Sequence, residues 1–600
     1  MAKTDKAVHT IFNERERFII IGLTGRTGSG CTMVSKILET EEFENLDLRE
    51  PKTTNFKSND ECKYHIIYNY AKEHWHPFIR LSMTDIIISF ISQNDIKLLK
   101  CLLNHIFNTN KLLCDNIYKE LLNYEDKDGI KFNDLYSKVN KVINECLDEN
   151  KSLKRQRDNK DDESKYLEKE FELIKEIGML QEIFRNVLRN YTYYIDIGDR
   201  KLKSNVYTYF LQQVGNNIRN NGDVFYEDFT GNHMITLARR ANDFIKAIRY
   251  VNGKEKNNVK PTLVCLDAIR NPYEATYFQD RYSSFYLVSV NTDDEERIRR
   301  LTNLNYEKCQ IESLDEIEYP KKLKGEIVFI NQNIGACSQL GDIHIYNPRE
   351  NTEEKFFLTQ LIVRYVTLMK HPGLITPSHI ERCMQIAYNA KLNSGCLSRQ
   401  VGAVITDSTY SVKAVGWNSV AECQVPCNLR DIKNYINNKD YDSFSKYEIE
   451  DEKFNKAMNE KYELIKESNL KGRLYAYCFK DIYGKITSND NQVHTRSLHA
   501  EENAFLQIVK HGGEGIKGGN LFTTASSCVL CSKKAYQLGI KHIYYIDPYP
   551  DIAIPHILTF GAEEQNPKTH LFYGAIGRAY TCLYTQRIAI KDELEMLINE

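Results

Sequence analysis

A run of apolar residues that leads directly into a glycine-rich loop restricts the possible fold more than any other feature of this sequence. Residues 17–24 are rich in β-branched side chains, which predicts a buried strand. Residues 32–38 then predict the start of a helix. The loop between them fits G-x-x-x-x-G followed by Thr and consists of Gly25, Arg26, Thr27, Gly28, Ser29, Gly30, Cys31 and Thr32. This order of elements predicts a phosphate-binding loop in an α/β domain.

Cys31 occupies the place of the lysine that phosphate-binding loops of this pattern carry. Backbone amides and the helix terminus can still hold phosphates, and the Thr32 hydroxyl can still meet Mg²⁺. The positive charge that stabilises phosphoryl transfer is missing, however. We therefore expect this loop to bind a nucleotide without turning it over.

The rest of the first domain, expected over 1–365, alternates between strand-like and helical segments. Strand-like runs at 193–197, 261–267, 285–290 and 342–346 predict a parallel sheet. Helical periodicity between about 60 and 190 predicts an inserted helical region. Asn347-Pro348 and His371-Pro372-Gly373 interrupt the next helix and predict a domain boundary there.

A second α/β domain is expected over 372–600, with a charged helical insertion at about 429–495. Its predicted elements are a helix at 378–393, strands at 400–406, 411–417 and 520–525, and helices that begin near His499 and Cys528.

Composition limits the classes of partner. The chain is 42% hydrophobic and 27% charged, which is enough apolar material for folded cores, and its net charge of -2 gives no global attraction for nucleic acid. The apolar runs are shorter than the roughly 20 residues of a membrane span. We expect a cytoplasmic protein without a membrane partner, in which the 16 cysteines are core residues or metal ligands rather than disulfides.

Four residues of the second domain form a zinc signature. Cys528-x-x-Cys531 alone is a weak signal, but it follows His499-x-Glu501 by 29 residues, and each group stands at a predicted helix N-terminus. Two thiolates and one imidazole can bind Zn²⁺ and leave the fourth position for water, as a catalytic site requires. Glu501 is then the general acid and base of a hydrolytic deamination. A closed structural zinc site remains the alternative, although it explains Glu501 poorly.

The second domain resembles deoxycytidylate deaminases over roughly residues 378–560. The resemblance rests on five blocks: Gln400-Val-Gly-Ala-Val-Ile, Gly416-Trp-Asn418, His499-Ala-Glu501-Glu-Asn-Ala, Cys528-Val-Leu-Cys531 and Gly539 to Tyr549. One departure is Ser527, where the family has proline; Ser526 or Ser527 can cap the following helix instead. The resemblance implies a cytidine deaminase-like α/β/α fold and a dCTP or dCMP substrate. It also implies that Asn418 contacts the sugar and Ala500 the pyrimidine, and that Tyr549 lines the pocket.

With the P-loop domain in front, the whole chain resembles the bacterial anti-phage dCTP deaminases. That resemblance implies a regulatory nucleotide at the P-loop, a homo-oligomer and restraint by a small RNA. The segment from Asp267 to Glu274 looks like part of P-loop nucleoside monophosphate kinases. It implies that Asp267 orients Mg²⁺ and that Arg270 meets a phosphate.

A second, structural zinc site is a further possibility. Phage-type deoxycytidylate deaminases hold such an ion with residues in similar places, and here the candidates are Cys396, Cys423, Cys427 and His494. Three thiols and one imidazole suit a closed site. Buried free cysteines beside a loop histidine are an equally good interpretation.

We therefore expect a zinc-dependent deaminase of cytosine deoxynucleotides that depletes dCTP in antiviral defence. A nucleotide-switched regulatory protein with a structural zinc is the alternative. A deaminase of polynucleotides would need an extended basic groove with aromatic platforms, which the near-neutral charge disfavours.

Overall fold

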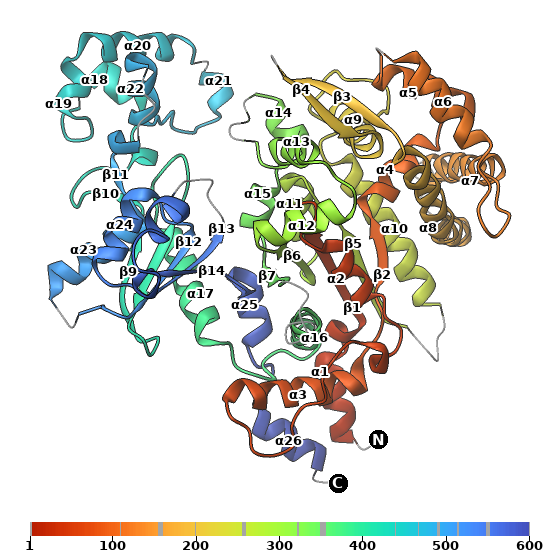
Figure 1. Cartoon of the computed structure of the whole chain (residues 1–600), viewed down its shortest axis with the longest axis horizontal. Helices are drawn as coiled ribbons and strands as arrows, with labels where there is room; N and C mark the ends of the chain where they lie inside the picture. Colours follow the sequence, from red (N-terminus) through yellow and green to blue (C-terminus); the bar gives the residue numbers. More distant parts are fainter. Residues whose placement is uncertain are drawn as a thin grey trace. The chain divides into compact units, whose positions relative to one another are not determined.

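The structure is a computed structural model in which the chain divides into two units (Figure 1). Unit 1 comprises Met1–Thr376 and Thr581–Glu600, and unit 2 comprises Pro377–Tyr580. The structure describes residues 3–598 except 109, 154–159, 198–199, 255–259, 321–322, 324, 349–355, 439, 466, 489–491, 513–514 and 548–552.

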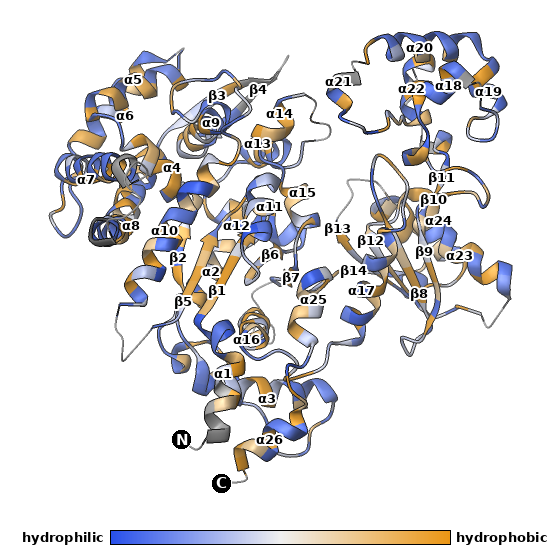
Figure 2. Ribbon diagram, turned by 180° about the vertical axis from the view of Figure 1, so that it is seen from behind, coloured by the Kyte–Doolittle hydropathy of each residue, from blue (hydrophilic) through white to orange (hydrophobic). Residues whose placement is uncertain are grey.

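Unit 1 is built on a sheet whose strands run β7-β6-β1-β5-β2, all parallel. The strands are β1 (Phe18–Thr24), β2 (Ile79–Ser82), β5 (Thr262–Asp267), β6 (Phe285–Asn291) and β7 (Ile343–Tyr346). Their apolar residues are buried, and β1 and β5 stand out as hydrophobic in Figure 2. The predicted parallel sheet is thus confirmed, with the glycine loop at the carboxyl end of its central strand.

Two details of unit 1 differ from the sequence analysis. The run at 193–197 forms β3 (Thr192–Ile197), which pairs antiparallel with β4 (Arg200–Asn205) in a separate hairpin. Strand β2 lies inside the expected helical insertion but belongs to the main sheet. It was missed because it has only four residues, one of them arginine, and so lacks a clear period.

The helices of unit 1 surround the sheet. Helices α4 to α8 build the inserted helical region, whose buried residues form one continuous core with those of the sheet. They are α1 (Lys3–Arg17), α2 (Cys31–Leu38), α3 (Asn59–His74), α4 (Met83–Ile91), α5 (Ile96–Ile106), α6 (Lys111–Leu122), α7 (Phe132–Leu153), α8 (Lys160–Leu188), α9 (Val206–Asn221), α10 (Thr236–Asn252), α11 (Pro272–Arg281), α12 (Asp294–Asn303), α13 (Lys308–Glu318), α14 (Ile327–Ile330), α15 (Ile334–Gln339), α16 (Phe357–Lys370) and α26 (Ile590–Ile598). The C-terminal segment, expected in the second domain, belongs to this unit.

Unit 2 contains a mixed sheet with the order β14-β13-β12-β8-β9. Its strands are β8 (Gly402–Thr406), β9 (Val412–Trp417), β12 (Asn520–Ala525), β13 (His542–Asp547) and β14 (Lys568–Leu571). β12, β13 and β14 are parallel, whereas β8 is antiparallel to both β12 and β9. Short segments β10 (Ser419–Val420) and β11 (Ser497–Leu498) pair beside this sheet, and β15 (Gly574–Ala575) and α25 (Gly577–Tyr584) lie near the end of the unit.

Alternate residues of the unit 2 strands face two helical layers. Val404 and Phe522 pack with α17 (His379–Lys391), whereas Ala403 and Ile405 pack with α23 (Ala500–His511) and α24 (Val529–Gln537). This period of two is the pattern of a sheet covered on both faces. The result is the expected α/β/α arrangement.

The charged segment of unit 2 folds as a small helical body with its own core. Its helices are α18 (Ile432–Asn438), α19 (Lys446–Glu450), α20 (Glu452–Glu463), α21 (Glu467–Leu470) and α22 (Phe479–Thr487). At its centre the fully buried Arg430 and Glu448 form an ion pair of 2.9 Å. Among the described helices of both units, none combines the length and the apolar character that crossing a bilayer requires.

Candidate deaminase active site

Two helix N-termini meet on one side of the unit 2 sheet. His499 is the N-cap of α23 and Cys528 is the N-cap of α24, while Cys531 lies one turn into α24. Both helices begin directly after a strand, β11 and β12, and this is what brings residues 29 positions apart together. The positive ends of both helix dipoles favour thiolates at this point.

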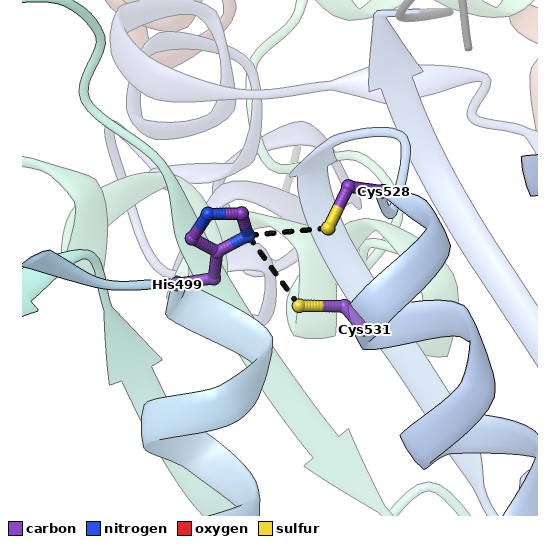
Figure 3. Close-up of side chains that lie close together, drawn as sticks. All are labelled: His499, Cys528 and Cys531. Atoms are coloured by element: carbon purple, nitrogen blue, oxygen red, sulfur yellow. Dashed lines mark hydrogen bonds between the residues drawn. The ribbon is translucent and has the colours of Figure 1, made fainter. Parts of the chain in front are cut away.

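The three predicted ligands converge on one point (Figure 3). His499 Nδ1 lies 3.3 Å from Cys528 Sγ and 3.5 Å from Cys531 Sγ. Tetrahedral zinc with bonds of about 2.1 Å to nitrogen and about 2.3 Å to sulfur separates such ligands by roughly 3.6 Å. The observed spacing therefore fits Zn²⁺. In the described part of the chain, this is the sole cluster of three or more His, Cys, Asp or Glu ligand atoms that lie within 4.8 Å of one another.

The electrostatics of the cluster favour metal ligation. A hydrogen bond from Cys531 and the neighbouring His499 lower the pKa of the Cys528 thiol to about 4. The same hydrogen bond, together with burial, raises the pKa of Cys531. Contact with Cys528 also raises the pKa of His499. One thiolate is thus already available near neutral pH, and its negative charge is complementary to a divalent cation.

Glu501 lies in the first turn of α23, two residues after His499, and is only 4% exposed. Burial raises the pKa of its carboxyl, and the nearby Ser527 hydroxyl acts in the opposite direction. A carboxyl with a raised pKa accepts and releases protons more readily near neutral pH. Ser527, expected as a possible helix cap, instead lies against Glu501, because Cys528 takes the N-cap position.

Comparison with known proteins agrees with this geometry. Residues 377–547 match the family model of the cytidine and deoxycytidylate deaminase zinc-binding region. This match lies within unit 2 and includes His499, Glu501, Cys528 and Cys531. This confirms the deaminase resemblance of the second domain.

Individual relatives match part of the chain. Deoxycytidylate deaminase of Enterobacteria phage T2 is 28% identical over 28% of this chain and 78% of its own length. ComE operon protein 2 of Bacillus subtilis is 41% identical over 9% of this chain and 28% of its own length. A crystal structure of dCMP deaminase from the cyanophage S-TIM5 covers 33% of this chain and 100% of its own, with 20% identity and a TM-score of 0.19.

Strand β9 and the residues after it form the wall of the deaminase region next to α23. A Cβ on Gly416 would lie 2.3 Å from the Ala500 carbonyl oxygen, so glycine is required for this close approach. Asn418 accepts a hydrogen bond from the Val401 amide and donates one to the Arg399 carbonyl, both at 2.7 Å. Ala500 is fully buried.

Substrate contacts of this region stay predictions. The Asn418 amide fixes the start of β8, a role that sequence reasoning missed, and its contact with a sugar is untested. Tyr549 lies outside the described residues.

The four candidate ligands of a second zinc are described but do not form a cluster of the kind found at His499. Cys427 is buried and its thiol pKa is raised, mainly by burial, with Cys396 close enough to add to the effect. Cys423 is exposed, and the ring of His494 lies against that of Tyr483 at a tilt of 53°, with ring centroids 4.7 Å apart. The second zinc stays a prediction.

In unit 1, the glycine loop connects β1 to α2 as expected. Gly28 and Gly30 have φ of 91° and 111°, and a Cβ on Gly25 would lie 2.5 Å from the Val290 carbonyl oxygen. Arg26 pairs with Asp294 at 2.5 Å and with Asp315 at 2.8 Å. Burial raises the pKa of the Cys31 thiol to about 12, so Cys31 brings no charge to the loop near neutral pH.

The predicted Mg²⁺ and phosphate residues of unit 1 have protein partners. Asp267 forms an ion pair with Arg80 at 2.7 Å, and Arg270 pairs with the fully buried Glu318. Sequence reasoning missed Glu318, because only the packing of α13 brings it to the loop. Binding of a nucleotide or Mg²⁺ here stays a prediction.

Proposed function

We propose that this protein is a zinc-dependent hydrolytic deaminase of cytosine deoxynucleotides, dCMP and dCTP. The observation that carries the proposal is the buried Glu501 carboxyl beside the gathered His499, Cys528 and Cys531. A closed structural zinc site has no use for a buried carboxyl at this place. Deoxycytidylate deaminases among the relatives indicate the substrate class.

His499, Cys528 and Cys531 would hold the zinc ion. When bound, zinc supplies Lewis acidity that lowers the pKa of a water molecule. Two thiolates from this chain balance the two positive charges of the ion.

Glu501 moves the protons of the reaction. Its carboxylate accepts a proton from the attacking water and delivers it to the pyrimidine ring nitrogen as oxygen adds to the C4 carbon. It then takes the proton of the new C4 hydroxyl group and passes it to the amino group. The C4–N bond breaks, ammonia leaves, and the C4 carbonyl of uracil forms.

The proposal also covers unit 1 and the consequence of the activity for phage replication. Nucleotide binding by the glycine loop of unit 1 would regulate the deaminase or position it. Conversion of dCTP and dCMP to uracil forms would deplete a DNA precursor and so restrict phage replication. Oligomerisation and restraint by a small RNA stay expectations from the resemblance to anti-phage dCTP deaminases.

The variant E501Q tests the proposal, with E502Q as the matched control. Both remove one negative charge from the first turn of α23. Glu502 pairs with Lys534 and accepts a hydrogen bond from the His499 backbone amide, which a glutamine at this position can still accept. We expect E501Q to lose about 10²- to 10⁴-fold in activity while keeping its zinc, and E502Q to keep both. Ammonia release by E501Q at the wild-type rate would refute the role of Glu501 in proton transfer. No ammonia release by the wild type would favour a regulatory protein with a structural zinc.

Substrate class is tested by separate incubations with dCMP, dCTP, cytidine and single-stranded DNA, each with and without a chelator. Chromatography of the products should show uracil forms of the two deoxynucleotides only, and none after zinc removal. Deamination confined to single-stranded DNA would support the polynucleotide alternative.

A further inference from the structure

The glycine loop of unit 1 holds a carboxylate of its own chain. The Thr27 amide donates a hydrogen bond of 2.9 Å to Glu318 Oε2, and the Thr27 hydroxyl donates to Glu318 Oε1. Arg270 Nη1 pairs with the same oxygen, while Arg270 Nη2 lies 3.1 Å from the Thr27 hydroxyl. Glu318 is fully buried.

These donors are the kind that bind phosphate groups. A backbone amide of a glycine loop, a hydroxyl and a guanidinium together recognise anionic oxygens through charge-assisted hydrogen bonds. The anion site of the loop is therefore supported by more than the N-terminus of α2, because its donors already bind the buried carboxylate of Glu318. A phosphate could not share these donors with Glu318, since two anions in one buried site repel each other.

Helix α13 has a second attachment that does not involve Glu318. Asp315 lies three residues earlier on the same face and pairs with Arg297 at 2.7 Å and with Arg26 at 2.8 Å. Ile311 and Leu314 anchor the helix through their buried side chains. The end of α13 after Asp315 can therefore move away from the loop while Asp315 keeps the rest of the helix in place.

We propose that Glu318 is an internal competitor for the anion site of the glycine loop, so that phosphate groups of a nucleotide bind at Thr27 and Arg270 only after Glu318 has left. The inference rests on the proposed nucleotide binding by unit 1 and adds how that binding is regulated. When only a fraction of the molecules has an open site, the measured affinity for a ligand is the affinity of the open site multiplied by that fraction.

The variant E318Q tests the proposal, with E316Q as the matched control. Both change one glutamate of α13 to its neutral isostere, but Glu316 is exposed. The probes, measured by isothermal titration calorimetry on the full chain with Mg²⁺, are inorganic tripolyphosphate for the anion site and ATP for a nucleotide. ATP is chosen because cytosine nucleotides would also bind the proposed deaminase site.

We expect E318Q to bind tripolyphosphate at least about tenfold more tightly than wild type, as for a site closed in about nine molecules of ten. E316Q should bind like wild type. The double variant E318Q/R270Q should lose the gain, which places the binding at Arg270.

Two results would overturn the inference, and they differ. Equal affinity of wild type and E318Q would leave the anion site intact but remove the role of Glu318. No binding of either probe to any variant would instead refute nucleotide binding by the loop itself.

Hydrogen exchange of the wild-type chain gives an independent test that needs no substitution. Saturating ATP should speed amide exchange in residues 316–319, because the end of α13 after Asp315 is released. Unchanged or slower exchange there in the ATP-bound chain would contradict the displacement of Glu318.

Discussion

Substitution of Gly416 by alanine should disable the deaminase site without touching a ligand. Gly416 lies in β9 directly against the first turns of α23, the helix that presents His499 and Glu501. An added Cβ would lie 2.3 Å from the Ala500 carbonyl oxygen and 2.5 Å from the Ala504 amide, where ordinary contact begins at 3.4 Å. The methyl group meets backbone atoms, which cannot rotate away as a side chain can.

The size of the effect follows from this overlap. The start of α23 must move by about 1 Å, and overpacking of this kind costs about 1–3 kcal/mol of stability. A displacement of about 1 Å at reacting groups lowers activity by roughly 10²-fold. The ligand geometry changes too, because Cys528 and Cys531 stay on α24 while His499 moves.

The assay combines dCMP deamination, zinc content and thermal unfolding of G416A. The control is G515A, which also adds one methyl group, at a glycine with no heavy atom within 4 Å of the new Cβ. We expect G515A to match wild type in all three measurements. Wild-type activity and full zinc content in G416A would refute the argument that β9 fixes the position of α23.

Three further predictions concern the inserted helices, a histidine pair and the zinc ligands of unit 2. Replacing the buried Glu448 by glutamine leaves the charge of Arg430 uncompensated and should destabilise the inserted helices by about 3–5 kcal/mol. Denaturant unfolding measures this against the control E450Q, whose glutamate is exposed. Equal stability of both variants would contradict the role of the ion pair. Burial lowers the pKa values of His542 and His570, whose Nδ1 and Nε2 atoms lie 3.0 Å apart, and the nearby Lys541 and Lys568 add to the effect. The unfolded chain therefore binds more protons than the folded chain below about pH 6.5. The free energy of unfolding should fall as pH drops through that value. The fall should be smaller in H570Q, and an unchanged pH dependence of its unfolding would argue against this pair. Metal analysis of C528S should show one zinc fewer per chain than wild type, with C101S unchanged; full zinc in C528S would exclude the proposed ligand set.

The local signals of this chain were sufficient for much of the fold. The apolar run at 18–24 and the glycines after it predicted β1, the loop and α2, because a buried strand and residues at positive φ depend on nearby sequence. The zinc ligands were predictable for a similar reason. Each stands at or near the start of a helix that follows a strand, and their residue types are those that zinc prefers.

Short or weakly patterned elements escaped prediction. β2 and β14 have four residues each and include charged side chains, so neither shows a period that a sequence can reveal. Both become strands because a neighbouring strand, β5 or β13, offers unpaired backbone groups at the right edge.

Contacts across long stretches of chain were decided only by the tertiary structure. Glu318 reaches Thr27 across 291 positions, and nothing in the residues near Glu318 distinguishes it from the exposed Glu316. The same holds for Ser527 beside Glu501 and for Gly416 against Ala500. The sequence by itself determined which chemical groups stand at the ends of strands and helices, since those positions follow from local propensity. Only packing decided which of these groups meet, because burial and close approach depend on elements that are distant in the chain.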